Sequence, residues 1–210
     1  ALQARPMTIA QWLAVACCCG MMVVDGYDTL AVTLALPGIA QEWGVTEVAL
    51  GGVVSIGLIG MAVGALLLGP IADMIGRRAT IFLGLALTFI GMGMSAAATG
   101  LGHLMMWRVC TGIGMGGLVA VSYPLAAEYS NQRNRSMVLA MMVLSFPLGG
   151  VIGGTLASWL MPVFGWRSAF VPGLIFPAIV TVASLRFLPE PLGLAIERVR
   201  PSSLKTANSY

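Results

Sequence analysis

Six stretches of this chain contain no Asp, Glu, Lys or Arg, and each is about as long as a membrane-spanning helix requires. They are Met7–Val24, Val48–Ala72, Ala79–Trp107, Val109–Ala127, Ser136–Trp166 and Ser168–Leu185. A helix needs about 20 apolar residues to cross the hydrocarbon core, where backbone groups must satisfy one another. We therefore predict an all-α membrane protein with six transmembrane helices, at about residues 9–36, 48–69, 79–98, 103–127, 137–161 and 168–188.

The composition excludes the main alternative, a soluble globular enzyme. Only 9% of the residues are charged, 58% are hydrophobic, and the mean hydropathy is +0.92, whereas soluble domains carry about 25% charged residues. No hydrolytic or redox constellation is present, and the cysteines lack metal-site spacing. We expect no enzyme activity, no cofactor and no metal. The cysteines then serve as small packing residues: Cys17, Cys18, Cys19 and Cys110.

The basic residues gather on one side of the predicted spans, as in a membrane protein, which argues against a nucleic-acid partner. Nine of the 11 Lys and Arg residues fall in the tails or in alternate loops that share one side of six spans. Only Arg167 falls on the other side, and Arg108 lies within a span. This positive-inside bias predicts a cell (inner) membrane protein with both termini in the cytoplasm. The nine are Arg5, Arg77, Arg78, Arg133, Arg135, Arg186, Arg198, Arg200 and Lys205.

Two acids interrupt the first span, in the run Asp25-Gly26-Tyr27-Asp28. Residues three apart share a helix face, so both carboxylates point the same way. A carboxylate at membrane depth is costly, and such residues mark substrate paths and proton relays. The alternative is that the acids lie at a helix end among the lipid headgroups. The eight residues that follow before Pro37 favour the buried position.

Apart from Arg186, two residues from the end of the sixth span, Arg108 is the only other charged residue inside a span. At 1.5 Å per residue, Asp28 lies about 12 Å and Arg108 about 8 Å from the outer ends of their spans. The two acids and the arginine are therefore expected within reach of each other. One carboxylate is then left without a fixed partner and is a candidate to take up and release a proton. Of the nearby rings, Tyr27 and Trp107 are candidates to stack on a flat substrate.

Small residues four apart let membrane helices approach closely. They recur in spans two and five, while spans one and four carry the buried charge. This division of roles predicts two triplets related as an inverted repeat. The spaced pairs are Gly60-xxx-Gly64, Gly149-xxx-Gly153 and Gly150-xxx-Gly154.

The connection between spans two and three reads Gly69-Pro70-Ile71-Ala72-Asp73-Met74-Ile75-Gly76-Arg77-Arg78. It closely resembles the G-x-L-A-D-x-x-G-R-R/K loop signature of the major facilitator superfamily, with Pro70 and Ile71 as a departure. The resemblance covers nearly the whole chain, as the N-terminal six-helix half of such a transporter. It implies a gating loop formed by Gly69, Asp73, Gly76, Arg77 and Arg78.

Further segments resemble the aromatic acid:proton symporter family, whose members import benzoate-type and hydroxybenzoate-type anions. The resemblance implies that spans one and four line a central cavity and that Asp25 and Asp28 handle protons or substrate. Arg108 would bind the substrate carboxylate or pair with an acid, since arginine offers bidentate donors. The matching segments are the Asp25–Asp28 run, Arg108-xxx-Gly112 to Gly117, Ala127-Glu128-Tyr129-Ser130, Gly165-Trp166-Arg167 and Leu188-Pro189-Glu190. The last segment departs from the family pattern, because Pro191 follows Glu190 where the family has a serine.

Three features have competing interpretations. The glycines from Gly112 to Gly117 follow no strand, so we expect helix packing rather than a dinucleotide loop. Glu128 with Arg133 and Arg135 is expected to form a cytoplasmic ion-pair latch rather than a catalytic group. His103 lies in a short outer loop, where a solvated residue is expected rather than a pH sensor.

A complete transporter of this fold has twelve spans, so we expect residues 1–190 to form one six-helix bundle, with 191–210 a cytoplasmic tail or the start of a linker. A second six-helix half is the expected partner, besides lipid, protons and a small organic anion. The leading hypothesis is proton-coupled import of an aromatic carboxylate. The alternatives are a sugar or metabolite porter, an efflux antiporter, and a truncated membrane module that does not transport.

Overall fold

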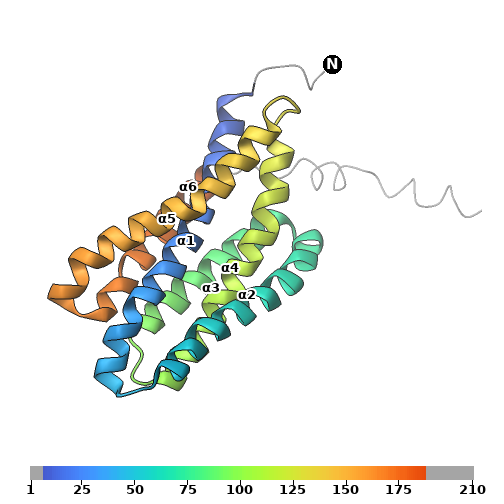
Figure 1. Cartoon of the computed structure of the whole chain (residues 1–210). Coiled ribbons are helices and arrows are strands. Elements are labelled where there is room, and N and C mark those ends of the chain that lie inside the picture. Colours follow the sequence, from blue (N-terminus) through green and yellow to red (C-terminus); the bar gives the residue numbers. More distant parts are fainter. Residues whose placement is uncertain (1–6, 188–210) are drawn as a thin grey trace, which may run out of the picture.

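The computed structural model describes residues 7–187, which form six long helices and one short 3₁₀ helix, η2, in a single elongated bundle (Figure 1). Each span is long and apolar enough to cross a membrane, with η2 and α6 forming the sixth. The predicted six-span fold is confirmed within this range. The elements are α1 (Ile9–Trp43), α2 (Glu47–Ile75), α3 (Arg77–Ala96), α4 (Leu101–Tyr129), α5 (Arg135–Phe164), η2 (Trp166–Phe170) and α6 (Pro172–Phe187).

Several predictions lie outside the described residues. These are the tail 191–210, the run Leu188-Pro189-Glu190 with Pro191, and the basic residues Arg5, Arg198, Arg200 and Lys205.

Helix α1 is longer than predicted, because it passes through Pro37 and ends only at Trp43. A proline removes one intrahelical hydrogen bond, which a long membrane helix with packed neighbours tolerates. The helix begins at a capping box formed by Thr8 and Gln11 and ends where Gly44 adopts a left-handed φ of 61°. The two acids of the first span consequently lie near the middle of α1 and not at a helix end, which the headgroup alternative required.

The predicted gating loop is mostly helical, which corrects the sequence interpretation. Helix α2 continues through Pro70 to Ile75, so Gly69 and Asp73 belong to its last turns. Only Gly76 separates α2 from α3, with φ 98° and ψ 145°. That conformation favours glycine and turns the chain within one residue. The connection is a hinge of one residue rather than a loop.

Helices α2 and α4 form one of the most extensive helix pairs in the bundle. Their backbones approach so closely that a Cβ atom at Gly60 would lie 2.7 Å from the carbonyl oxygen of Val109. A Cβ atom at Gly64 would collide with the backbone of Ile113. The predicted small-residue contact is confirmed for this pair.

Helices α1 and α5 form a second extensive pair. A Cβ atom at Gly149 would collide with the backbone of Val23, and one at Gly153 would lie 3.2 Å from the ring of Tyr27. At the second predicted pair, 150 and 154, a Cβ atom would meet the Leu30 side chain at 3.2 Å or more and the Gly26 backbone oxygen at 3.8 Å, without a collision. Helix α5 therefore packs on α1 through one of its two glycine stripes.

The two helix pairs are related in the way an inverted repeat requires. If α1 corresponds to α4 and α2 to α5, the pair α2–α4 corresponds to α5–α1. Gly60 and Gly64 of α2 meet Val109 and Ile113 of α4. In the same way, Gly149 and Gly153 of α5 meet Val23 and Tyr27 of α1, so in both pairs a valine is followed four positions later by the second contact. The repeat is thus visible in the packing, although the sequence similarity between the triplets is faint.

Candidate functional site

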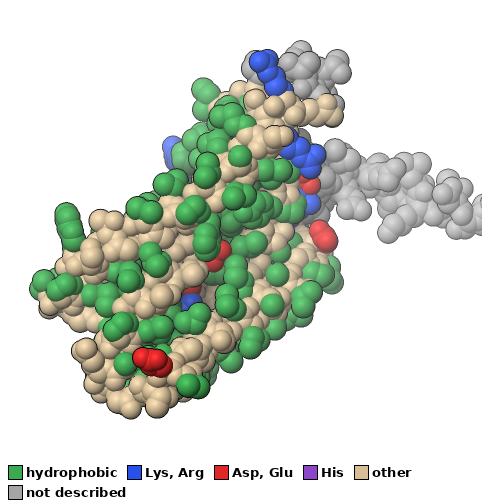
Figure 2. Space-filling model, in the orientation of Figure 1, with side chains coloured by type: hydrophobic (Ala, Val, Ile, Leu, Met, Phe, Trp, Pro, Cys, Tyr) green, Lys and Arg blue, Asp and Glu red, His purple; other side chains and the backbone are tan. Residues whose placement is uncertain are grey.

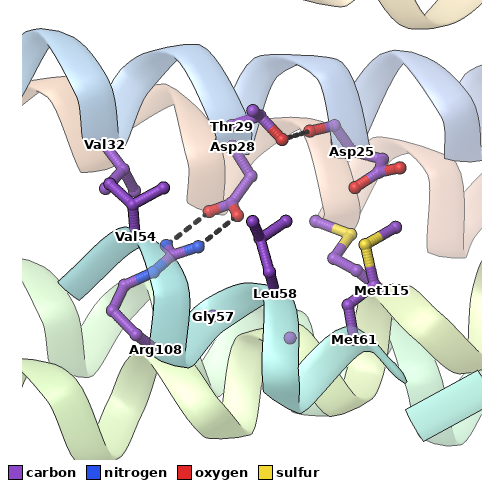
Figure 3. Close-up of a pocket in the computed structure, with 11 residues that line it drawn as sticks. Asp25, Asp28, Thr29, Val32, Val54, Gly57, Leu58, Met61, Arg108 and Met115 are labelled. Atoms are coloured by element: carbon purple, nitrogen blue, oxygen red, sulfur yellow. Dashed lines mark hydrogen bonds and ion pairs between the residues drawn. The ribbon is translucent and has the colours of Figure 1, made fainter. Parts of the chain in front are cut away.

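A small cavity of about 40 Å³ lies between α1, α2 and α4 (Figure 3). It is large enough for ordered water but small beside the ligand pockets of about 300–1,000 Å³ that enclose a whole substrate. Figure 2 shows mainly apolar side chains over this face, with red and blue atoms in a hollow between the helices. The lining residues are Asp25, Asp28, Thr29, Val32, Val54, Gly57, Leu58, Met61, Arg108, Gly112 and Met115.

Asp28 and Arg108 form a bidentate ion pair across the cavity. The Nη1 atom of Arg108 donates to Oδ1 of Asp28 at 2.8 Å, and Nη2 donates to Oδ2 at 2.5 Å. Both residues are at most 5% exposed. Paired N–H donors facing both carboxylate oxygens form the strongest type of ionic hydrogen bond in proteins. The contact predicted between spans one and four is therefore made by Asp28.

Asp25 lies one helical turn before Asp28 on the same face of α1, and it is 5% exposed. Within residues 7–187, its carboxylate makes no hydrogen bond or ion pair. The Thr29 hydroxyl donates to the backbone oxygen of Asp25 at 3.1 Å and leaves the carboxylate untouched. The surplus carboxylate expected from the sequence is thus Asp25.

Glycines of α2 and α4 lie beside the guanidinium and between the two helices. A Cβ atom at Gly57 would lie 3.7 Å from both Nε and Nη2 of Arg108. At Gly112, a Cβ atom would collide with the backbone of α2, so this glycine sets the helix spacing. The Nε atom of Arg108 is buried and has no hydrogen-bond partner among the described residues. Arg108 thus keeps one unused donor beside the cavity.

Tyr27 does not line the cavity, contrary to the sequence prediction. Its hydroxyl donates to the carbonyl oxygen of Ala169 in η2 at 2.7 Å, and its ring meets Phe176 of α6 at 5.2 Å. Each residue turns a helix by 100°, so Tyr27 points away from the face that carries the two acids. Its contacts join α1 to the sixth span.

Trp107 also lies off the cavity, because it is adjacent to Arg108 in the helix and faces another direction. Its ring contacts that of His103 at 6.1 Å. Its Nε1 atom is buried without a hydrogen-bond partner in the described part of the chain. Neither ring predicted to stack on a substrate lines the cavity.

Sequence reasoning missed the apolar wall of the cavity, above all Met61 and Met115. Met115 lies seven residues after Arg108, which is two turns along the same face of α4. Met61 lies four residues after Gly57, which faces Arg108. Helical spacing from the buried arginine could have found Met115, but the glycine spacing of span two did not indicate that α4 is the helix it meets.

The ion pair at the end of α4 differs from the predicted latch. Glu128 pairs with Arg77 at 2.6 Å, with side chains 55% and 25% exposed. In the part of the chain described, neither Arg133 nor Arg135 forms an ion pair with Glu128. Arg77 is the first residue of α3 and is brought to α4 by the Gly76 hinge. The sequence pattern paired Glu128 with its neighbours in the chain and missed this closer arginine.

The other residues of the predicted gating segment have separate contacts. Arg78 donates to the carbonyl oxygen of Leu185 near the end of α6 at 3.2 Å. Asp73 is exposed and forms no ion pair with any residue that the structure describes. This end of the bundle therefore joins α3 to both α4 and α6 through two adjacent arginines.

The opposite end carries a second cluster that sequence reasoning did not identify. Glu42 of α1 accepts hydrogen bonds from Trp166 Nε1 at 2.7 Å and from Arg167 at 2.6 Å. Arg167 also donates to the carbonyl oxygen of Ala98 at 3.1 Å and lies over the Trp166 ring. The cluster ties η2 to α1 and to the segment after α3.

Comparison with known proteins decides the family. Residues 16–206 match the model of the Major Facilitator Superfamily. The chain belongs to this superfamily. Together with its six apolar helices, this makes it a multi-pass membrane protein of a transporter family, not an enzyme.

Similar proteins within the superfamily include the 4-hydroxybenzoate transporter PcaK of Acinetobacter baylyi, which is 40% identical over 88% of this chain and 40% of its own length. The gallate transporter of Pseudomonas putida is 33% identical over 95% of this chain and 44% of its own length. The chain thus spans less than half the length of these relatives.

Among solved structures, the partially occluded inward-open form of the xylose transporter XylE from E. coli superposes with a TM-score of 0.76. The superposition covers 87% of this chain and 49% of XylE, at 18% identity. At that identity the likeness shows the fold alone. It confirms that the bundle is arranged as in a transporter of this superfamily.

Proposed function

We propose that the chain forms the N-terminal half of a secondary active transporter that imports an aromatic carboxylate, such as a benzoate or hydroxybenzoate, together with protons. One observation carries the proposal: the buried Asp28–Arg108 ion pair lies beside a buried carboxylate, Asp25, that has no hydrogen-bond partner among residues 7–187. The 4-hydroxybenzoate and gallate transporters among the relatives support an aromatic acid as substrate.

The charges of the site suit an anion that moves with a proton. Two ionised carboxylates and one guanidinium leave a net charge of −1 in a buried cavity, which is unfavourable until one acid is protonated. An incoming carboxylate can replace Asp28 on Arg108, because both offer the same pair of oxygens. The released Asp28 then needs a proton in turn. Substrate binding and protonation are coupled through competition for Arg108.

The remaining parts of the proposal concern the assembly. A second six-helix half completes the substrate site, since the cavity of this half is too small to enclose a ligand. The basic end of the bundle, with Arg77, Arg78, Arg133, Arg135 and Arg186, faces the cytoplasm. Both termini of the chain then lie on that side.

A hexose fits this half of the site poorly. Besides the three charged residues, Thr29 is the only lining side chain with a hydroxyl or amide group, and its hydroxyl already donates to a backbone oxygen. Sugar hydroxyls need many polar partners, which this wall does not supply. The charged pair and apolar wall therefore favour an aromatic acid over the sugar-porter alternative.

The experiment is an uptake panel in cells that express the full-length protein. Labelled benzoate, 4-hydroxybenzoate, a hexose and an amino acid are offered with and without a protonophore. We expect accumulation of the aromatic acids and its loss with the protonophore. Protonophore-sensitive uptake of the hexose alone, or no uptake of any aromatic acid, would contradict the proposal.

A further inference from the structure

The cavity has two chemically different ends. Figure 3 shows the guanidinium of Arg108 joined to Asp28 at one end, while the side chains of Met61 and Met115 converge below Asp25 at the other. The two methionines come from different helices, α2 and α4. An ionic end and a sulfur-lined end therefore face the same space.

We infer that Met61 and Met115 form the surface against which the ring of the substrate packs, and that they set the preference for an aromatic over a saturated ring. This inference rests on the proposed function, because it assumes that Arg108 holds the substrate carboxylate. It goes further by assigning the recognition of the ring to two thioethers.

The positions of the methionines fit this role. Met115 lies seven residues after Arg108, which is about 10 Å along α4. Met61 lies one turn after Gly57, which faces the guanidinium of Arg108. A carboxylate bound at Arg108 can thus direct its ring along the cavity toward both sulfur atoms.

Methionine chemistry suits an aromatic ring. The thioether is polarizable and makes favourable contacts with aromatic rings at a sulfur-to-ring distance of about 5 Å. Its unbranched side chain adapts to rings with different substituents. The aromatic side chains near the site are turned elsewhere, since Tyr27 packs on η2 and Trp107 is adjacent to His103. Ring recognition in this half consequently falls to the sulfur-lined end.

The competing interpretation is that both residues only fill the core. Met115 is 1% exposed and belongs to a buried cluster with residues from α1 to α5, whereas Met61 is partly exposed. Core packing predicts that a substitution changes folding, or changes the transport of all substrates alike. Ring recognition predicts that it changes the ratio between an aromatic acid and a saturated acid of the same charge.

The test compares uptake of labelled benzoate by the full-length protein in competition with unlabelled benzoate and with cyclohexanecarboxylate. The variants are Met61→Leu and Met115→Leu, which keep the volume and remove the sulfur. Met106→Leu is the matched control, because Met106 is on α4, 56% exposed and outside the cavity. We expect each cavity variant to lower the preference for benzoate about two- to tenfold, and the control to keep it.

An unchanged preference in Met61→Leu would overturn the inference, even if Met115→Leu fails to fold. Equal loss of both acids at a constant ratio would overturn it as well, since that is the result of altered packing. If the unmodified protein takes up neither acid, the proposed function itself fails. The wild-type arm therefore distinguishes the two failures.

Discussion

The carboxylate of Asp28 and the guanidinium of Arg108 join α1 to α4 at the centre of the bundle through two hydrogen bonds of 2.8 and 2.5 Å. These helices correspond to each other in the inverted repeat. The ion pair therefore lies between the two triplets rather than inside one of them. If another carboxylate replaces Asp28 on Arg108, the contact between α1–α3 and α4–α6 therefore changes directly.

The first prediction concerns stability. Asp28→Asn leaves Arg108 buried without its counter-charge, which should cost about 3–5 kcal/mol of unfolding free energy. Asp25→Asn is the matched control, because the Asp25 carboxylate has no hydrogen-bond partner among the described residues. Thermal unfolding in detergent measures both. Equal stability of the two variants would contradict the assignment of the ion pair to Asp28.

The second prediction uses two adjacent glycines of α5. Gly149→Ala places a methyl group against the backbone of Val23 and should cost about 1–3 kcal/mol, as overpacking usually does. Gly150→Ala meets only atoms at 3.8 Å and should be tolerated. Detergent unfolding of the purified variants checks the difference. A larger cost at position 150 would show that α5 packs on α1 through the other stripe.

The third prediction concerns the hinge between α2 and α3. Gly76→Val forces a branched side chain into φ 98°, and Asp73→Ala alters the adjacent exposed turn of α2. Both should slow transport more than they weaken substrate binding, because this end lies away from the cavity. Equilibrium binding to purified full-length protein, compared with uptake, separates the effects. Binding weakened as much as transport would refute a gating role.

The fourth prediction concerns the exposed ion pair at the same end. Glu128→Gln removes the partner of Arg77, but the pair is 55% and 25% exposed, so the loss of stability should be about 1 kcal/mol or less. Arg135→Gln, which removes no ion pair seen in the described residues, serves as the control. Unfolding at low and high salt measures the contribution, and the difference between the variants should shrink as salt rises.

The spans and the buried charges could be predicted from the sequence, for two reasons. Charge-free stretches of sufficient length have few alternatives in a membrane. Spacing within one helix also determines that Asp25 and Asp28 share a face. Depth along the helices then placed Arg108 near them.

Relations between helices could not be predicted in the same way. The rotation of α1 against α4 decides that Asp28, not Asp25, pairs with Arg108, and it turns Tyr27 toward η2. Helix ends were also missed, because packed membrane helices continue through Pro37 and Pro70. The sulfur-lined wall depends on which helix meets the glycine face of α2, and spacing in a single helix carries no such information.

The most direct test of the central claim measures accumulation of labelled 4-hydroxybenzoate in proteoliposomes that contain the full-length protein and an inward proton gradient. Wild type should accumulate the acid above equilibrium. Asp25→Asn should exchange labelled for unlabelled acid but no longer accumulate it, because the site has lost its unpartnered carboxylate. Asp28→Asn should also fail to accumulate the acid. Accumulation near the wild-type level in both variants would contradict proton coupling through this site.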